Sequence, residues 1–565
     1  MFAILLTVSM FSQGFTMVSY GKSFITAFPE DLGYFYSNTS SRLKVTALYD
    51  GTSVDIFYNG SSTPTETISN ILKGQTVTVV FSKSAEVYQL DYSTQSIRIT
   101  SNKYIVVHSF SSTNFTITAI SAQTNIVQPD ENLGMNYLIP SLNYTTFLTT
   151  FGISQSTSWS PKYNSFRLII INAKDTENNI TIVKNISAQI QLVNFTIPSY
   201  QLIQLQADDS MMMVNSSHKI AVLLTHPCLD RTNYTCSMII NQILPVRFQG
   251  QNFVVPFVRG ITQRQLFMTS NDKADLLSQY NTSLTPSSSG YLSLPDLNTR
   301  YVTASSNVSL KLIIPGLFIE LIPENQFAAC YMMPFYSNYQ WAVVITKTDS
   351  RDQVRIGTAP FINPVWLEIS NTQYSKTEIF LSRQLIVIWH PSSKIAVYVV
   401  ETIGNTVFGG PAIPINEQPD PNGCMTPGEF VVGDQPLKWT ESLAYCTNTQ
   451  SQFACPINED VQIEFIKQVN TKNVEGWIGL RRSLMTTAWY WQTNTTSASS
   501  SVNYIYWANG QPQDNTTELC ASLSLNHTDD FKWKSAKCCE KKLPVCYKQP
   551  QILLPLTMSS TVYIP

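Results

Sequence analysis

Four cysteines near the end of the chain constrain its fold more than any other feature. They stand at a patterned spacing, with a Trp-Ile-Gly-Leu segment at 477–480 and a Gly-Gln-Pro segment at 510–512 between them. The four are Cys446, Cys520, Cys538 and Cys546. Apolar residues recur at helical spacing in 439–446 and in 461–469, so two short helices are expected before a group of strands. This part of the chain is predicted to form an α+β domain.

The pattern resembles a C-type lectin-like domain, which we place at residues 424–548. The disulfides that the resemblance implies are Cys446–Cys546 and Cys520–Cys538. Three cysteines of the domain remain, and a bond between Cys455 and Cys539 stays open. Cys424 would then be odd and available for an intermolecular bond.

Calcium-dependent sugar binding in this family needs oxygen ligands, because Ca²⁺ is held by oxygen atoms. The family supplies them from a Glu-Pro-Asn or Gln-Pro-Asp triplet, a Glu two residues before the second conserved Cys, and a Trp-Asn-Asp triplet. At these places the chain has Gln511-Pro512-Gln513, Glu518 and Trp533-Lys534-Ser535. Glu518 is the only well-matched calcium ligand. Lys534 puts an ammonium where an oxygen is needed and is expected to pair with Glu518. No cofactor is therefore expected, and calcium is the alternative.

The same positions are the predicted ligand-binding residues. They are Gln511, Gln513, Glu518 and Lys534. A glycosylation sequon at Asn515 lies in the same loop, where a glycan would crowd a sugar-binding face. Aromatic residues that could stack on sugars are expected instead to belong to the core or to anchor loops. They are Trp489, Tyr490, Trp491, Tyr504, Tyr506 and Trp507.

Residues 20–408 repeat themselves and are predicted to form strands throughout. The segment 102–107 recurs at 218–223, and the segment 134–140 recurs at 250–256. Both recurrences share one offset, 116 residues from Lys103 to Lys219, which indicates a tandem duplication. Further copies of the first segment are 325–330 and 393–398.

Four repeat units are therefore expected. They lie near 20–135, 136–250, 251–338 and 339–408. Units of this size that end in a buried strand suit stacked β-sandwiches, and a β-propeller with shorter blades is the second choice. The predicted fold class is mostly β, with tandem β-sandwich-like repeats followed by the α+β lectin-like domain.

Two segments near the N-terminus, 22–30 and 45–54, carry a second resemblance. With the repeated Ser-x-Lys-Ile-Ala-Val and Tyr-x-x-Pro phrases, they resemble the N-terminal domain of IgG Fc-binding protein and its relatives. The resemblance covers about residues 20–410 and implies a secreted, mucus-type or epithelial-surface setting. It does not imply antibody binding here, because no residue set for that activity carries over.

Three further segments are assigned from composition. Residues 1–14 are expected to be a signal peptide, because 2–11 are nearly all apolar, the alternatives being a truncated start or a first strand. Residues 409–423, rich in Pro and Gly, are predicted to be a linker, and 549–565 a tail. No membrane span is expected.

The repeat region contains three cysteines. Cys228 and Cys236 are expected to close a small loop, and Cys330 is expected to be a core thiol. The chain also carries fourteen Asn-x-Ser/Thr sequons, which support export. They are Asn38, Asn59, Asn114, Asn143, Asn179, Asn185, Asn194, Asn215, Asn233, Asn281, Asn307, Asn494, Asn515 and Asn526.

Catalysis and nucleic-acid binding are not expected. The five histidines are scattered, and the sequence has no nucleophile elbow, phosphate loop or dinucleotide motif. A net charge of −2 gives no broad basic face. The sequence therefore predicts a secreted glycoprotein that recognises a glycan or an extracellular protein, plausibly in surface defence. The alternative is a structural matrix or mucus component crosslinked through disulfides.

Overall fold

A computed structural model describes most of the chain. The described residues are 17–31, 39–113, 122–152, 165–186, 189–207, 212–230, 237–256, 264–270, 274–278, 289–293, 300–314, 317–333, 340–361, 364–381, 386–403, 406–469, 474–493, 500–513, 516–526, 529–554 and 556–564. The predicted signal peptide at 1–14 lies outside them.

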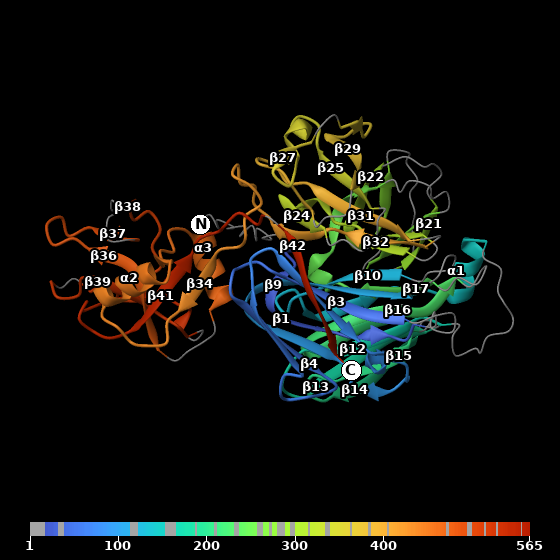
Figure 1. The fold of residues 1–565 in the computed structure, drawn as a ribbon, viewed down its shortest axis with the longest axis horizontal. Helices are drawn as coiled ribbons and strands as arrows, with labels where there is room; N and C mark the ends of the chain where they lie inside the picture. The colour runs from blue at the N-terminus through green and yellow to red at the C-terminus, as the bar shows by residue number, and fades with distance from the viewer. Residues whose placement is uncertain are drawn as a thin grey trace, which may run out of the picture. The chain divides into compact units, whose positions relative to one another are not determined.

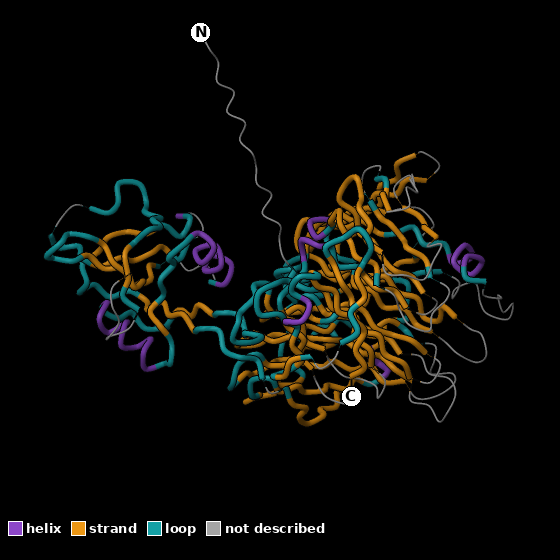
Figure 2. The backbone as a smooth tube through the Cα atoms, turned by 90° about the horizontal axis from the view of Figure 1, so that it is seen from above, coloured by secondary structure: helices purple, strands orange, loops and turns teal. Residues whose placement is uncertain are grey.

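The chain divides into two compact units. One contains the residues up to 425 together with 552–565, and the other contains 426–551. Figure 2 draws strands in orange, and they make up most of the larger unit, whereas the smaller unit combines strands with two helices. The prediction of a mostly β chain with an α+β domain is confirmed. Within the described ranges, no helix is long and apolar enough to cross a membrane.

In the first repeat, one long strand belongs to two layers. The first half of this strand, β9, pairs with β1 and β4, and its second half pairs with β3 and β10. Apolar side chains from both halves, among them Ile99 and Val107, meet in one core, which makes the repeat sandwich-like. The strands are β1 (Tyr20–Thr26), β2 (Phe28–Pro29), β3 (Thr39–Ala47), β4 (Thr52–Tyr58), β5 (Glu66–Ile71), β6 (Gln75–Phe81), β7 (Glu86–Val87), β8 (Tyr92–Ser93), β9 (Ile97–Thr113) and β10 (Ala122–Val127).

The second and third repeats have the same plan. Their long strands, β16 and β22, pair with one set of neighbours in the first half and another set in the second half. The elements are β11 (Gly134–Ile139), α1 (Tyr144–Thr150), β12 (Arg167–Asn172), β13 (Asn178–Ile186), β14 (Gln189–Ile197), β15 (Leu202–Gln206), β16 (Met212–Asp230), β17 (Ser237–Gln242), β18 (Gly250–Val255), β19 (Gln265–Thr269), β20 (Leu276–Ser278), β21 (Ser289–Ser293), β22 (Arg300–Ile314) and β23 (Leu317–Glu320).

The fourth repeat is divided between two five-stranded sheets. Its strands are β24 (Cys330–Met333), β25 (Gln340–Lys347), β26 (Arg355–Ile356), β27 (Ala359–Pro360), β28 (Leu367–Glu368), β29 (Tyr374–Leu381), β30 (Ile386–Trp389), β31 (Ala396–Ile403), β32 (Thr406–Pro411) and β33 (Ile413–Asn416). The described residues also include short 3₁₀ turns at η2 (Lys83–Ala85), η5 (Val246–Phe248), η6 (Glu324–Gln326) and η7 (Arg351–Gln353).

The assignment of 325–330 to the first repeated segment is wrong. The hydroxyl of Tyr331 accepts from the Ala328 N–H and donates to the Ile395 carbonyl. The hydroxyl of Tyr137 bonds Gly134 and Ile220 in the same way. Residues 328–333 are therefore a further copy of the 134–140 segment, and the fourth repeat begins near 328 rather than at the predicted 339. Phrases rich in small apolar residues resemble both segments, which explains the error.

The four repeats close into a ring. In each repeat the strand after the long strand, namely β10, β17, β23 or β32, pairs with it. These four strands also contact one another in turn, and the last, β32, contacts the first, β10. Figure 1 shows β10 and β32 side by side although they lie at opposite ends of the repeat region. Sandwich-like repeats thus combine with the closed arrangement that a propeller would have.

A close backbone contact recurs where one repeat joins the next. A Cβ atom placed on Gly134 would lie 2.7 Å from Pro245 Cβ and 2.9 Å from its Cγ. Gly250 faces Pro323 in the same way, and Gly21 faces Pro129. The glycine begins the first strand of a repeat, and the proline begins the turn that leads to the next repeat. The glycine is needed because the proline ring occupies the place of a side chain.

The predicted linker at 409–423 is wrong for most of its length. Its first residues belong to β32 and β33, which pair with β31 and β24. A disulfide also joins Cys330 to Cys424, so Cys330 is not a core thiol and Cys424 is not odd. Backbone amides hold the Pro-rich and Gly-rich residues in sheets here, because an edge strand tolerates both residue types.

The predicted tail at 549–565 is also ordered within the larger unit. After the lectin-like unit the chain forms β42 (Thr557–Ile564), which pairs in parallel with β6 of the first repeat. Ile564 is 3% exposed and joins the core of that repeat. The smaller unit is therefore an insertion between two parts of the repeat ring.

The smaller unit has the two predicted helices and a disulfide-bonded core. Its elements are β34 (Glu429–Val432), α2 (Trp439–Asn448), β35 (Gln452–Phe453), α3 (Glu459–Gln468), β36 (Glu475–Arg482), β37 (Trp489–Trp491), β38 (Ser500–Ser501), β39 (Cys520–Ser524), β40 (Trp533–Ala536) and β41 (Leu543–Lys548). Asn458 caps α3, since its side chain accepts from the Val461 N–H. The Glu441 carboxylate accepts from the Lys438 N–H at the start of α2.

Candidate functional site

Three of the four predicted ligand residues meet around one serine. Ser535, on β40, donates its N–H to Gln511 Oε1 at 2.9 Å. Its Oγ lies 2.9 Å from the same oxygen and 2.5 Å from Glu518 Oε2, and it accepts from the Gln513 N–H at 3.0 Å. A hydroxyl carries one proton, so Ser535 donates it to one of the two oxygens at a time. These contacts fix the loop at 511–513 against β40.

Lys534 lies apart from this group. Its Nζ is 3.4 Å from Glu475 Oε1 and 3.7 Å from Asp529 Oδ2. Successive side chains of a strand point to opposite faces, so Lys534 and Ser535 serve different sides of β40. The expected Lys534–Glu518 pair is wrong, and so is the grouping of Lys534 with the other three residues.

Glu475 is an ionised carboxylate at the centre of a second polar cluster. Burial disfavours its charge, but Lys542, Ser522 and Lys534 together outweigh burial, so the pKa of Glu475 lies below its ordinary value. Lys542 contacts the carboxylate directly, and Ser522 donates to it at 3.1 Å. The carboxylate is therefore already bonded to two lysines and a hydroxyl, which leaves it poorly placed to bind a metal ion.

The residues do not fit the calcium site of C-type lectins. Gln511 Oε1 already accepts from the Ser535 backbone, and Glu518 is bonded to the Ser535 hydroxyl. Lys534 supplies a positive charge rather than an oxygen. Across the described residues, no group of three or more His, Cys, Asp or Glu side chains converges as metal ligands do.

The aromatic residues of this unit pack mainly against its core. Trp491 is 2% exposed, and Trp489, Tyr504, Tyr506 and Trp507 pack against the same apolar cluster as partly buried residues. The rings of Trp489 and Trp507 lie 4.9 Å apart between centroids. This agrees with a structural role. The large apolar side chains that are exposed nearby belong to loops, Leu484, Met485 and Ile505.

The cysteines of the smaller unit follow the family pattern. The structure contains both disulfides that the resemblance implies, Cys446–Cys546 and Cys520–Cys538. Among the described cysteines, Cys455 and Cys539 are free, so the open alternative of a bond between them is not adopted. Burial raises the pKa of the Cys455 thiol above its ordinary value, which makes it unreactive.

Two other groups of predicted sites fall partly outside the described residues. Cys228 is disulfide-bonded, but its predicted partner Cys236 lies outside them. The sequons whose asparagine lies outside are Asn38, Asn114, Asn233, Asn281, Asn494 and Asn515. The side chain of Asn185 is also outside. The described sequon asparagines that are exposed are Asn59, Asn179, Asn194 and Asn307.

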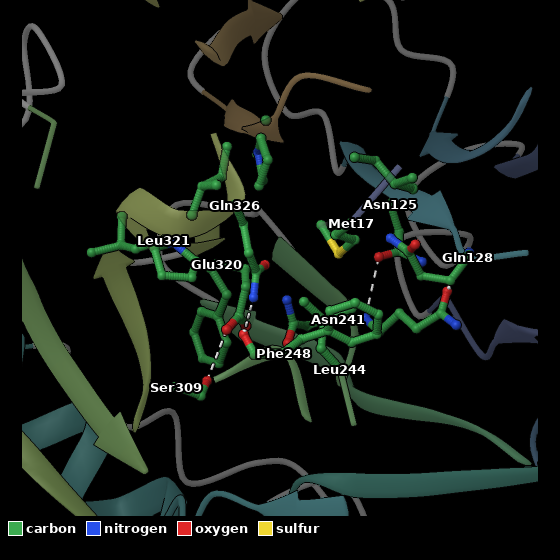
Figure 3. A pocket seen from close by; sticks show the side chains of 18 of the residues that line it. Met17, Asn125, Gln128, Asn241, Leu244, Phe248, Ser309, Glu320, Leu321 and Gln326 are labelled. Carbon is green, nitrogen blue, oxygen red and sulfur yellow. Dashed lines mark hydrogen bonds between the residues drawn. The ribbon is translucent and has the colours of Figure 1, made fainter. Parts of the chain in front are cut away.

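The axis of the repeat ring encloses a cavity that sequence reasoning missed. Its volume is about 70 Å³, room for several water molecules. Side chains from β10, β17 and β23 line it, together with the backbone of β32. Figure 3 shows Asn125 and Asn241 on one side and Gln326 and Glu320 on another. No motif marks these residues, because they come from four repeats.

Amide side chains give this cavity a polar but uncharged lining. Glu320 accepts from Ser309 at 2.8 Å and pairs with Lys311, so its charge is neutralised. Among the described residues that line the cavity, four buried amide atoms have no hydrogen-bond partner. They are Asn125 Nδ2, Asn241 Oδ1, Gln242 Nε2 and Gln326 Oε1. Two donors and two acceptors can satisfy ordered water or a small uncharged polar molecule.

Comparisons with known proteins agree with both parts of the fold. A family model described as IgGFc binding protein matches residues 123–400. A second, described as Lectin C-type domain, matches residues 435–548. Both are families of binding proteins, so the chain is a mostly β binding protein assembled from two modules. It carries an IgGFc-binding-protein domain followed by a C-type lectin domain, as the two resemblances predicted.

The relatives are distant. Human Lithostathine-1-beta is 28% identical over 121 residues, which cover 21% of this chain and 69% of that protein. Human IgGFc-binding protein is 24% identical over 269 residues, which cover 46% of this chain but span only 5% of the relative's length. Among solved structures, human lithostathine has a TM-score of 0.19 and 23% identity, covering 21% of this chain and 90% of that one.

Proposed function

We propose that this chain is a secreted, N-glycosylated protein that recognises a glycan or a protein at an extracellular or mucosal surface, in surface defence. The two binding modules support recognition rather than catalysis. Recognition takes place on the lectin-like unit, at the face formed by Gln511, Gln513, Glu518 and Ser535, and it needs no calcium.

The observation that carries this proposal is the position of the Ser535 hydroxyl. It bonds two side chains that a calcium lectin would direct at the ion, Gln511 and Glu518. These side chains are therefore held in place without a metal. Gln513 is exposed beside them, and its backbone N–H is bonded to Ser535. An ordered amide and carboxylate can bond ligand hydroxyl or amide groups directly.

The test is binding of the intact chain to a panel of glycans and extracellular proteins, with matched variants. Gln513→Ala should weaken binding by about tenfold, since one ligand hydrogen bond is worth roughly 1.4 kcal/mol. Lys534→Ala, on the opposite side of β40, should leave binding within about twofold. Equal losses in both variants would place the ligand elsewhere.

The main argument for the alternative function, a matrix or mucus component crosslinked through disulfides, no longer holds. It relied on Cys424 as an odd cysteine, and Cys424 is bonded to Cys330. The exposed free thiol in the described residues is that of Cys539. A non-reducing gel decides between the two functions, because the recognition proposal expects a monomer band. A ladder that collapses on reduction, and that Cys539→Ser abolishes, would favour the matrix function.

A further inference from the structure

The hairpin β13–β14 has an unusual outer face. Strand β14 is an edge strand, because it ends the order of its sheet and, among the described strands, pairs with β13 alone. Its Ile190 is 73% exposed and its Leu192 is 63% exposed. Exposed apolar residues on an unpaired edge invite pairing with another chain, and natural proteins protect such edges. Something should therefore cover this face.

Three of the predicted sequons lie along this hairpin, and the two whose side chains are described share this face. Residues paired across an antiparallel ladder point to the same side of the sheet, and alternate residues along a strand do too. In the register of the hairpin, Asn185 pairs with Ile190, and Val183 pairs with Leu192. Asn194 follows Leu192 by two residues and therefore lies on the same face. Thr196 follows Asn194 by two residues, and it pairs with Asn179.

The two described asparagines are held in a reciprocal arrangement. Asn194 Oδ1 accepts from the hydroxyl of Thr181 at 2.9 Å, and Asn179 Oδ1 accepts from the hydroxyl of Thr196 at 3.0 Å. Each threonine belongs to the other asparagine's sequon. Both bonds use the amide oxygen, so the amide nitrogens, which carry N-linked glycans, stay free for modification. Both asparagines are exposed.

We infer that N-glycans at Asn179, Asn185 and Asn194 cover the apolar edge formed by Ile190 and Leu192. The inference rests on the proposed N-glycosylation and goes beyond it by assigning a protective function to three of the glycans. A glycan is bulky and strongly solvated, so it blocks the approach of a second strand along β14. It also covers apolar side chains that would otherwise face water or another molecule.

The first part of the test measures occupancy. The full chain is secreted from a eukaryotic cell line, and each site is quantified by mass spectrometry of glycopeptides. The inference predicts glycans at Asn179, Asn185 and Asn194. Bare sites on the hairpin would overturn it, while leaving the recognition proposal to its own ligand-binding test.

The second part measures association. The triple variant Asn179→Gln, Asn185→Gln, Asn194→Gln should aggregate at lower concentration than the wild type in light scattering. Asn307→Gln, an exposed sequon on β22 in another sheet, is the matched control and should behave as the wild type does. Unchanged association of the triple variant would overturn the inference.

A rescue variant tests whether the glycans act by covering the apolar edge or are needed for folding in general. Ile190→Thr and Leu192→Thr are added to the triple variant, which removes the apolar face but restores no glycan. The inference predicts that secretion and monomeric behaviour return. If the five-residue variant still aggregates or is not secreted, the glycans act in another way and the inference fails.

Discussion

At the residue scale, repeats that differ in sequence keep one buried hydrogen-bonded tyrosine. Tyr137 and Tyr331 each join the first strand of a repeat to a strand far along the chain. Both side chains are fully buried. In the third repeat the equivalent residue is Phe253, whose ring is also buried but has no hydroxyl. The hydroxyl therefore adds stability to a position whose ring is required for packing.

Removing either hydroxyl should destabilise the ring. Tyr137→Phe leaves a buried N–H and carbonyl without that partner, which costs roughly 1–3 kcal/mol of unfolding free energy. Tyr331→Phe should cost less, because the Ala328 N–H also donates to the Ile395 carbonyl. Urea unfolding followed by fluorescence measures the change. Tyr563→Phe, at a side chain that is 75% exposed, is the control and should change stability by less than about 0.5 kcal/mol. An equally large loss of stability in Tyr563→Phe would show that the buried tyrosine hydrogen bonds are not the cause.

The Ser535 network also predicts how the unit responds to calcium once the network is replaced. Lys534→Asn combined with Ser535→Asp removes a nearby ammonium and places a carboxylate beside Gln511 and Glu518. The double variant should gain a calcium-dependent rise in melting temperature, because bound ligand stabilises the folded state. Thermal unfolding across a calcium titration measures it. Saturable calcium stabilisation of the wild type would show that the native residues do bind the ion.

At the element scale, the contact between glycine and proline fixes how consecutive repeats meet. Gly134→Ala places a methyl group against Pro245, and neither element can move easily because each lies in a sheet or a hydrogen-bonded turn. The expected cost is roughly 1–3 kcal/mol, typical of overpacking. The control is Gly410→Ala, where a Cβ atom meets nothing within 4 Å. Chemical denaturation of both variants measures the difference, and equal stabilities would contradict this explanation of the repeated glycine.

Sequence reasoning succeeded where elements are local and failed where partners are distant. The two helices at 439–446 and 461–469 follow from spacing within about ten residues, and the structure has them at α2 and α3. The Cys330–Cys424 bond joins residues 94 positions apart, and no local pattern reports such a pairing. The ring of β10, β17, β23 and β32 depends on how four repeats pack, which composition does not encode.

The candidate site shows the same limit. Ser535 stood out in the sequence only as a replaced ligand, because a serine carries no charge or metal preference. Its role came from three partners in a loop and a neighbouring segment, Gln511, Gln513 and Glu518. Lys534 seemed to belong to the same group because it is adjacent in sequence. Because successive side chains of β40 point to opposite faces, Lys534 and Ser535 lie on different sides of the strand.

At the scale of the whole molecule, the ring carries a buried histidine where its first repeat faces the axis. Burial, with a smaller contribution from the Lys44 ammonium, lowers the pKa of His108 to about 3. His108 lies across from Lys44 on β3 and from Ile126 on β10, and it lines the axial cavity. Its imidazole is therefore neutral in the folded protein at neutral pH, which keeps the axis free of an unpaired charge.

This histidine should make stability depend on pH in the acid range. Between pH 6.5 and about 3 the unfolded chain binds a proton at His108 that the folded chain does not, so unfolding becomes easier as pH falls. The contribution is roughly 1.4 kcal/mol per pH unit, present above pH 6.5 and lost toward pH 3. Denaturation of the wild type and His108→Gln between pH 4 and 7 measures it. The stability of His108→Gln should depend less on pH than that of the wild type. His218→Gln, which changes an exposed side chain, should keep the pH dependence of the wild type.

The central claim is that the lectin-like unit of this binding protein recognises its ligand without calcium. The most direct measurement is binding of the intact, secreted chain to a glycan and protein panel, once with calcium and once with excess chelator. The account predicts the same ligands with the same affinities in both conditions, because the Ser535 network replaces the ion. Binding that disappears in chelator and returns with calcium would contradict it.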